Sequence, residues 1–328
     1  MTPALMRCGL RWASPAGHRG RLSVLVLHRV VTEPDTLLVE TMVADRFDAM
    51  CLWLKALFNV LPLDEAVQRL RTGTLPARAL SITFDDGYAD NRVVALPILL
   101  QHGLTATFFV ATGFVNGGLM WNDAIVEAMR NSPLPQLDLS SLLPELAEPL
   151  KLTDGHHRRA AAEAVIANVK YRPLAERQAL VDAVVQSSGA TAPRDLMMST
   201  TQILELHQAG MQIGAHTVSH PILATLADAE ARREIEKSKQ FLEGVIGERV
   251  TLFAYPNGKP QEDFNARTVA IARELGFEAA VTTAPGAASG RTDLLQVPRF
   301  TPWDRTQLRF ALRMLGNLRA SPGNPLMA

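Results

Sequence analysis

Short apolar runs alternate along this chain with segments whose apolar residues recur at helical spacing, and this alternation constrains the fold most. The pattern is typical of βα units, in which helices connect the parallel strands of a sheet or barrel. The apolar runs predict strands at residues 22–27, 79–84, 105–110, 211–215, 250–255, 277–282 and 294–300. Helical spacing predicts helices at residues 44–58, 91–101, 200–208, 228–245 and 265–275. The helix at 228–245 is charged and amphipathic, and we expect Glu234, Lys237 and Lys239 on its solvent-facing side. The expected fold class is therefore α/β.

One long interval breaks the alternation. Residues 116–199 contain no clear strand, while residues 160–170 and 174–186 have helical spacing. We interpret the interval as an α-helical insertion into a barrel. The predicted organisation is a basic N-terminal extension, the barrel with its insertion and a flexible tail, at residues 1–21, 22–320 with 116–199 inserted, and 321–328.

Residues 1–32 contain five arginines and no acidic residue, which superficially resembles a targeting segment. The apolar run at 22–27 is too short and too late for a secretory signal. No stretch approaches the roughly 18 apolar residues that a membrane-spanning helix needs. We therefore expect a cytoplasmic protein. Lys plus Arg and Asp plus Glu both total 33, so the net charge of zero argues against a nucleic-acid partner.

Two adjacent carboxylates, Asp85 and Asp86, directly follow the predicted strand at 79–84. The carboxyl ends of parallel strands are where α/β proteins build their sites, because the following loops converge there. Adjacent residues that leave a strand point in different directions, so one carboxylate can bind a cation while the other acts as a base. The alternative interpretation is an Asp-Asp-Gly surface turn.

Two histidines, His216 and His220, follow the predicted strand at 211–215. Imidazoles four residues apart can bind one metal ion, and neutral histidine is the commonest ligand of Zn²⁺ and similar ions. Together with Asp86 they would leave coordination positions open for water and substrate, as in a catalytic site. The predicted cofactor is a divalent metal, with Zn²⁺ favoured.

Residues 83–87 and 216–221 together resemble the motifs of the NodB-type polysaccharide deacetylase family, carbohydrate esterase family four. Members of that family adopt a distorted (β/α) barrel and hydrolyse N-acetyl groups on glycans. The resemblance implies that Asp85 is the general base and that Asp86 ligates the metal with both histidines. Residues 253–258 resemble a third family motif, which implies that the backbone N–H of Asn257 helps to form an oxyanion hole.

Two family features are missing from their usual positions. The third motif normally begins with an arginine that orients the basic aspartate, but Ala254 occupies that position. We consider Arg299 the candidate replacement, although an arginine at a strand end is as often a structural ion-pair partner. The C-terminal Leu-x-His motif, which normally supplies the general acid, is also absent from residues 296–302.

His28 is the candidate general acid. Residues 26–30 resemble the N-terminal Tyr-His segment of the poly-N-acetylglucosamine deacetylase branch, in which the acid motif is circularly displaced. The first and last strands are neighbours in a closed barrel. The residue that acts as general acid can therefore come from either end of the sequence and occupy the same position in space. The alternative is a buried core histidine.

These residues predict a hydrolase that removes N-acetyl groups from a glycan or a sugar precursor. The metal would polarise the amide carbonyl, Asp85 would take a proton from water and His28 would protonate the leaving amine. The alternatives are a deformylase or other amidohydrolase that acts on a lipid-linked sugar, and a non-catalytic glycan-binding protein that retains the metal site. The intact Asp85 argues against the binding protein, because a binder needs no base.

The segment 305–318 combines a basic stripe with an apolar face at helical spacing. Such a helix would suit peripheral contact with an anionic membrane surface. Packing against the barrel is the alternative and the more common use of an amphipathic helix.

Overall fold

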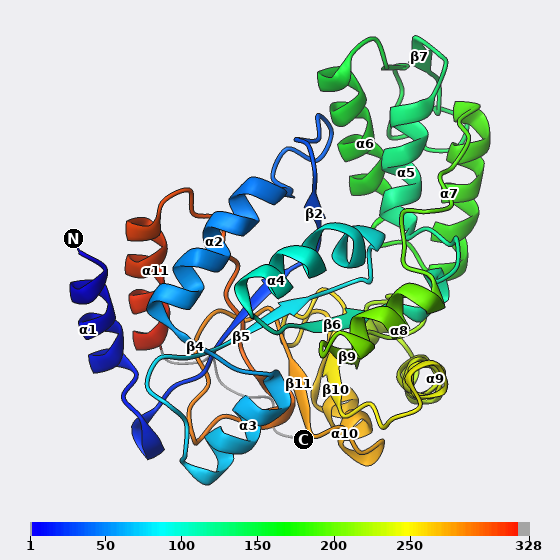
Figure 1. Ribbon diagram of the computed structural model, residues 1–328. Coiled ribbons are helices and arrows are strands. Elements are labelled where there is room, and N and C mark those ends of the chain that lie inside the picture. The colour runs from blue at the N-terminus through cyan, green and yellow to red at the C-terminus, as the bar shows by residue number, and fades with distance from the viewer. Residues whose placement is uncertain (1, 321–328) are drawn as a thin grey trace. The chain divides into compact units, whose positions relative to one another are not determined.

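The computed structural model describes residues 2–320, which separate into two compact units (Figure 1). Within the described residues, the first unit comprises 2–32, 42–115 and 198–320. The second unit comprises Glu33–Thr41 and Asn116–Met197. The predicted flexible tail at 321–328 lies outside the described part of the chain. No helix in that part is long and apolar enough to cross a membrane.

A parallel sheet forms the centre of the first unit, with the strand order β1-β5-β6-β9-β10-β11 and with β4 paired to β5. Its strands are β1 (Ser23–Leu27), β4 (Asn59–Val60), β5 (Ala79–Phe84), β6 (Thr107–Val110), β9 (Gln212–Ala215), β10 (Leu252–Ala254) and β11 (Ala279–Val281). Six of the seven predicted strands are present, most of them shorter than predicted. Strand β5 is buried along its whole length, as expected for a parallel strand covered on both faces.

The two faces of the sheet carry different residues because successive side chains of a strand alternate. Leu80 and Phe84 of β5 join the large core beneath the outer helices. Ala79 instead belongs to a second apolar cluster, which also contains residues of β1, β6, β10 and β11 and lines the inner face of the curled sheet. By the same alternation, Thr83 and Asp85 lie on the inner face.

The predicted strand at 294–300 is wrong, because this segment forms a 3₁₀ turn, η5 (Leu294–Gln296), followed by irregular chain. Pro298 has no N–H to donate, so a regular ladder cannot continue through it. The segment still joins the two edges of the sheet. Val297 bridges β11, and Phe300 bridges β1, with an N–H that donates to the Val24 carbonyl at 2.8 Å.

Helices pack around this sheet. They are α1 (Pro3–Ala13), α2 (Ala44–Leu57), α3 (Leu63–Thr72), α4 (Leu96–His102), α8 (Thr200–Gln208), α9 (Asp228–Ile246), α10 (Ala266–Glu274) and α11 (Gln307–Arg319). The predicted helix at 91–101 begins as a π-helical turn over Asn91–Ala95, since Pro97 cannot donate an ordinary helical hydrogen bond. The first unit also contains a short parallel pair, β2 (Val30–Val31) with β3 (Met42–Val43). The sequence pattern did not indicate α1, α3, β2, β3 or β4.

The second unit has a core of its own. It contains the helices α5 (Trp121–Asn131), α6 (Gly155–Val169) and α7 (Leu174–Ser188) and the antiparallel pair of β7 (Gln136–Leu137) with β8 (Leu150–Lys151). The upstream segment Glu33–Thr41 joins this unit through Leu37, which is buried in the same core, and through an Asp35–Arg130 ion pair of 2.7 Å. The unit therefore combines pieces from two distant parts of the chain.

Candidate active site

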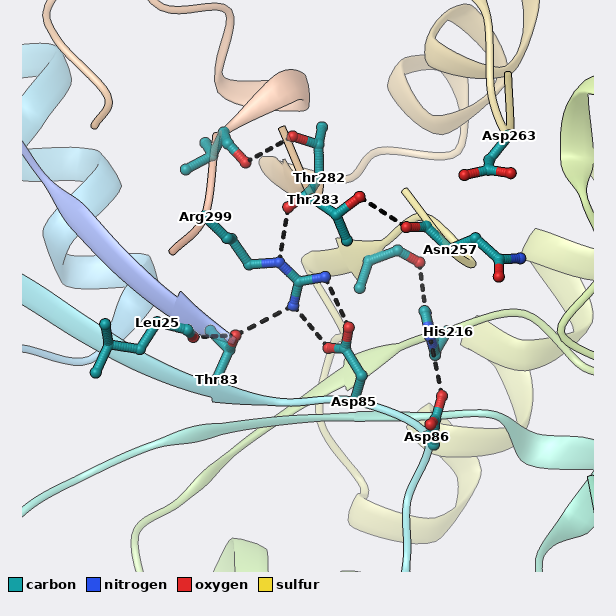
Figure 2. Close-up of polar contacts among 12 residues, drawn as sticks. Leu25, Thr83, Asp85, Asp86, His216, Asn257, Asp263, Thr282, Thr283 and Arg299 are labelled. Carbon is teal, nitrogen blue, oxygen red and sulfur yellow. Dashed lines mark hydrogen bonds and ion pairs between the residues drawn. The ribbon is translucent and has the colours of Figure 1, made fainter. Parts of the chain in front are cut away.

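Asp85 forms a buried ion pair with Arg299 on the inner face of the sheet (Figure 2). The two guanidinium Nη atoms of Arg299 each donate to one carboxylate oxygen of Asp85, both at 2.7 Å. Its Nη1 also donates to Thr83 Oγ1 at 3.2 Å, and its Nε donates to the Thr282 carbonyl at 2.8 Å. The structure thus brings the proposed replacement arginine onto the carboxylate that it was expected to orient.

Asp86, His216 and His220 come together beside this pair, with one potential ligand atom from each residue within 4.8 Å of the others. Asp86 Oδ1 lies 3.5 Å from His216 Nε2 and 3.6 Å from His220 Nε2. His216 Nδ1 lies 2.7 Å from the Ala254 carbonyl and donates its proton to it, so Nε2 is the nitrogen that faces Asp86 and is available to a metal ion (Figure 2).

These three donors fit a divalent transition metal. Ligands about 2.0–2.1 Å from a tetrahedral ion are separated by roughly 3.3 Å, close to the separations between Asp86 and the two imidazoles. Two nitrogen donors and one carboxylate are also the ligand types that suit Zn²⁺ in a site with an open position. The set that the sequence predicted is therefore a chemically suitable metal site.

The loops that carry the ligands have an unusual backbone. Asp86, Thr217 and His220 all have positive φ angles, of 78°, 65° and 52°. A positive φ is particularly unfavourable for a β-branched residue such as Thr217. Strain of this kind persists only where surrounding contacts hold it, and it concentrates at functional sites.

Contacts from the loop after β6 hold both ligand loops. The N–H groups of Ala111 and Thr112 donate to the carbonyls of Asp86 and Thr217, at 3.1 and 3.0 Å. Gly113 donates to the Val218 carbonyl at 2.8 Å, and a Cβ atom at position 113 would lie only 2.7 Å from that oxygen. The close approach of the two loops therefore requires glycine here.

Glu234 supports the site from outside it, and the sequence pattern missed this role. We expected it on the solvent-facing side of α9, but its carboxylate accepts hydrogen bonds from the N–H groups of Val218 and Ser219, at 2.9 and 2.8 Å. It also accepts from Ser219 Oγ at 2.9 Å. These three bonds fix the turn between the two histidines, so Glu234 positions the metal ligands without touching the site itself.

The ionisation states in the site follow from burial and mutual charge. Burial is the largest single effect on Asp85 and opposes its ionisation, but the charge and hydrogen bonds of Arg299, together with the charges of His216 and His28, outweigh it and hold the pKa of Asp85 below its ordinary value. Burial likewise opposes ionisation of Asp86, and the hydrogen bond with His216 lowers the pKa of Asp86. The same partner raises the pKa of His216 against the effect of its burial. Burial and the charge of His216 lower the pKa of His220 to about 4.

His28 lies immediately after β1, next to the end of β5. The register pairs Leu27 with Phe84, and the Asp85 N–H donates to the Leu27 carbonyl at 2.9 Å. The His28 side chain is exposed, so the alternative of a buried core histidine is wrong. Its charge contributes to the lowered pKa values of both Asp85 and Asp86. The structure therefore places an imidazole in electrostatic reach of the two carboxylates.

Asn257 occupies a tight turn after β10. The Gly258 N–H donates to the Pro256 carbonyl at 2.6 Å, with Asn257 between them at a φ of 57°. The Asn257 carbonyl accepts from Thr283 Oγ1 at 2.7 Å (Figure 2). Within residues 2–320, no group accepts a hydrogen bond from the Asn257 N–H. The turn thus presents a backbone donor that the fold does not use.

A protein-family model described as "Polysaccharide deacetylase" matches residues 72–137 and 177–280, which include the Asp pair, both histidines and Asn257. The putative polysaccharide deacetylase YxkH of Bacillus subtilis is 23% identical over 245 residues, 74% of this chain. The match spans 59% of the length of that relative.

Two solved structures share the fold. Streptococcus pyogenes deacetylase PplD, in complex with acetate, is 21% identical with a TM-score of 0.59, over 92% of this chain and 99% of that chain. IcaB from Ammonifex degensii is 18% identical with a TM-score of 0.58, over 94% and 99% of the two chains. The predicted α/β fold of NodB type is confirmed.

Proposed function

Because this chain belongs to the polysaccharide deacetylase family, we propose that it is a metal-dependent hydrolase that removes N-acetyl groups from a glycan or a glycan precursor. One observation carries the proposal: a buried carboxylate, Asp85, is held by Arg299 directly beside a three-donor group that suits a divalent ion. Zn²⁺ is the ion that we propose for this group. PplD was solved with acetate, which would be a product of this reaction.

In the proposed mechanism, Asp86, His216 and His220 would hold the ion, which would supply Lewis-acid polarisation of the amide and a water of lowered pKa. Asp85 accepts the proton of the attacking water, and its lowered pKa keeps it ionised and ready to do so at neutral pH. Arg299 fixes both oxygens of Asp85, so the carboxylate is oriented before the substrate arrives.

The remaining two residues act on the intermediate and the leaving group. The unused N–H of Asn257 donates to the developing oxyanion, a type of contact whose loss typically costs about 10²–10³ in rate. His28 protonates the amine as the C–N bond breaks, because an unprotonated amine is a poor leaving group. The exposure of His28 suits this role, since the residue can exchange its proton with solvent between turnovers.

The experiment is release of acetate from N-acetylglucosamine oligosaccharides by the purified protein loaded with Zn²⁺. An N-formyl analogue, tested in parallel, separates deacetylation from the alternative deformylase activity. Asp85→Asn should retain the metal and lose activity by on the order of 10²–10⁴-fold, the usual contribution of a general base. His220→Ala should lose metal and activity together.

Two results would contradict the proposal. If neither substrate is hydrolysed by the metal-loaded parent protein while the glycan binds, the chain is a glycan-binding protein. If Asp85→Asn and the parent hydrolyse the amide at equal rates, Asp85 is not the base.

A further inference from the structure

The helices α1 and α11 lie side by side at one edge of the first unit and form what we call the basic helix pair (Figure 1). The guanidinium of Arg319 lies over the ring of Trp12 at 5.0 Å. Arg21 Nη1 donates to the carbonyl of Ala320, the residue that caps α11, at 3.2 Å. These contacts connect the two ends of the described chain into one surface.

Each helix buries one side and leaves an apolar stripe on the other. Met6 and Leu10 of α1 and four residues of α11 belong to the large core, the latter being Phe310, Ala311, Met314 and Leu318. The packing that the sequence suggested for the C-terminal helix is therefore present, but it uses only one face. On the outer faces, Leu5 and Trp12 are 60% and 74% exposed, and Leu308 and Leu312 are 40% and 50% exposed.

The charges between these apolar residues are all positive. Helix α1 carries Arg7 and Arg11, and α11 carries Arg309, Arg313 and Arg319, while neither helix contains an Asp or Glu. Among the arginines of α11, Arg313 is occupied by the buried Asp304 at 2.7 Å. Within the described residues, no ion pair engages Arg309 or Arg319 of α11, or Arg7 or Arg11 of α1.

A second observation concerns Arg78, whose backbone N–H donates to the carbonyl of Ser14, the residue that caps α1, and which adds a further positive charge beside this helix. Burial lowers the pKa of the neighbouring Arg78, and the positive charges of Arg7 and Arg11 lower it further. The Arg78 Nε atom is buried without a hydrogen-bond partner within the described residues. Like charges thus accumulate beside α1, and an external anion would relieve their repulsion.

We propose that the basic helix pair binds the surface of an anionic lipid bilayer, lying in the interface without crossing it. Leucine and tryptophan side chains enter the boundary between headgroups and acyl chains, while arginines contact the headgroup phosphates. A second copy of the chain is the less suitable occupant, because a symmetric contact would place arginines against arginines. Nucleic acid is also less suitable, since it would leave the exposed leucines unburied.

Flotation of the full-length protein with vesicles tests the proposal. The protein should float with phosphatidylglycerol vesicles at low salt, remain unbound with phosphatidylcholine and dissociate as salt is raised. The triple variant Arg7→Gln/Arg11→Gln/Arg309→Gln should lower the partition coefficient by on the order of 100-fold, given the usual contribution of a cation near an anionic surface. Failure of the parent protein to float with phosphatidylglycerol at low salt would overturn the proposal.

A second set of variants tests the apolar stripe. Trp12→Gln/Leu308→Gln/Leu312→Gln should also reduce vesicle binding, whereas Val93→Gln/Leu100→Gln, which changes two exposed apolar residues of the same unit outside the pair, should not. Equal losses in both sets would overturn the proposal. A different result would also overturn it: the parent protein self-associates in light scattering, Trp12→Gln/Leu308→Gln/Leu312→Gln abolishes this self-association, and the parent does not bind vesicles. That result would assign the surface to a second copy of the chain.

The flotation result is independent of the proposed hydrolysis. All of these variants should release acetate from soluble oligosaccharides at the rate of the parent protein, because none of the changed residues lies at the active site. A protein that floats but does not hydrolyse would refute only the enzymatic proposal.

Discussion

Replacing Arg299 by Met removes the guanidinium and keeps most of the side-chain volume. Asp85 then remains in the inner face of the sheet without the two hydrogen bonds of 2.7 Å that now compensate its charge. Both side chains are almost completely buried, so water cannot replace the lost partner. Removing one member of a buried ion pair typically costs 3–5 kcal/mol, and we expect Arg299→Met to lower the free energy of unfolding by about 4 kcal/mol at pH 7.5.

The pH dependence identifies the cause. In the parent protein the pKa of Asp85 is lowered, so its ionisation stabilises the fold above the unfolded pKa, and this stability is lost as pH falls through the folded pKa. In Arg299→Met, burial loses its largest opposing contribution, and we expect it to raise the pKa of Asp85. Stability of the variant is then greatest below the unfolded pKa and is lost as pH rises through the raised folded pKa. The difference between the two proteins should therefore shrink from pH 7.5 to pH 5.

Urea unfolding followed by circular dichroism, with a chelator present, measures both quantities. Arg299→Lys is the matched control, since it keeps the charge but cannot reproduce the bidentate contact, and it should lose less stability. Asp85→Asn combined with Arg299→Met should be more stable than Arg299→Met alone, because no buried charge remains. A loss of less than 1 kcal/mol, or a loss independent of pH, would refute the reasoning.

Two further predictions concern the proposed acid and the ligand loop. His28→Ala should bind metal normally and hydrolyse an amide about 10²–10⁴-fold more slowly than the parent protein. The loss should be smaller on an activated ester, because its leaving group needs little protonation. Equal losses on both substrates would indicate a structural role for His28. Glu234→Gln should weaken metal affinity by about 10–100-fold, because the donors of the turn between the two histidines lose a carboxylate acceptor. Competition with a chelator measures the affinity. Glu236→Gln, on the same helix, is the control and should leave the affinity unchanged. Unchanged affinity in Glu234→Gln would show that the turn between the two histidines keeps its conformation without the hydrogen bonds to Glu234.

The central strands and the residues at their ends could be predicted because both follow from local patterns. A continuous apolar run such as residues 79–84 indicates a buried parallel strand, and such strands share one edge at their carboxyl ends. It follows that Asp85 and Asp86 should lie near the histidines after β9, as the structure has them.

The other parts of the site depend on contacts that no local pattern records. Helical spacing assigned Glu234 to the solvent side of α9, but the turn after β9 passes over that side and supplies three donors to its carboxylate. The apolar run at 294–300, which contains Arg299, predicts a strand, although Pro298 prevents a regular ladder. Membership of Glu33–Thr41 in the second unit likewise rests on long-range contacts, such as the pair between Asp35 and Arg130.

The pairing of Asp85 with Arg299 also sets an order of events during synthesis, since 214 residues separate the two side chains. At about 5–20 residues per second, a ribosome needs roughly 10–40 s to make the intervening chain. The proposed metal ligands are complete once His220 has been made, well before the partner of Asp85 exists. Because burying an unpaired carboxylate is unfavourable, the sheet cannot close around Asp85 until Arg299 emerges. A nascent chain could thus acquire its metal ligands first and its oriented base last.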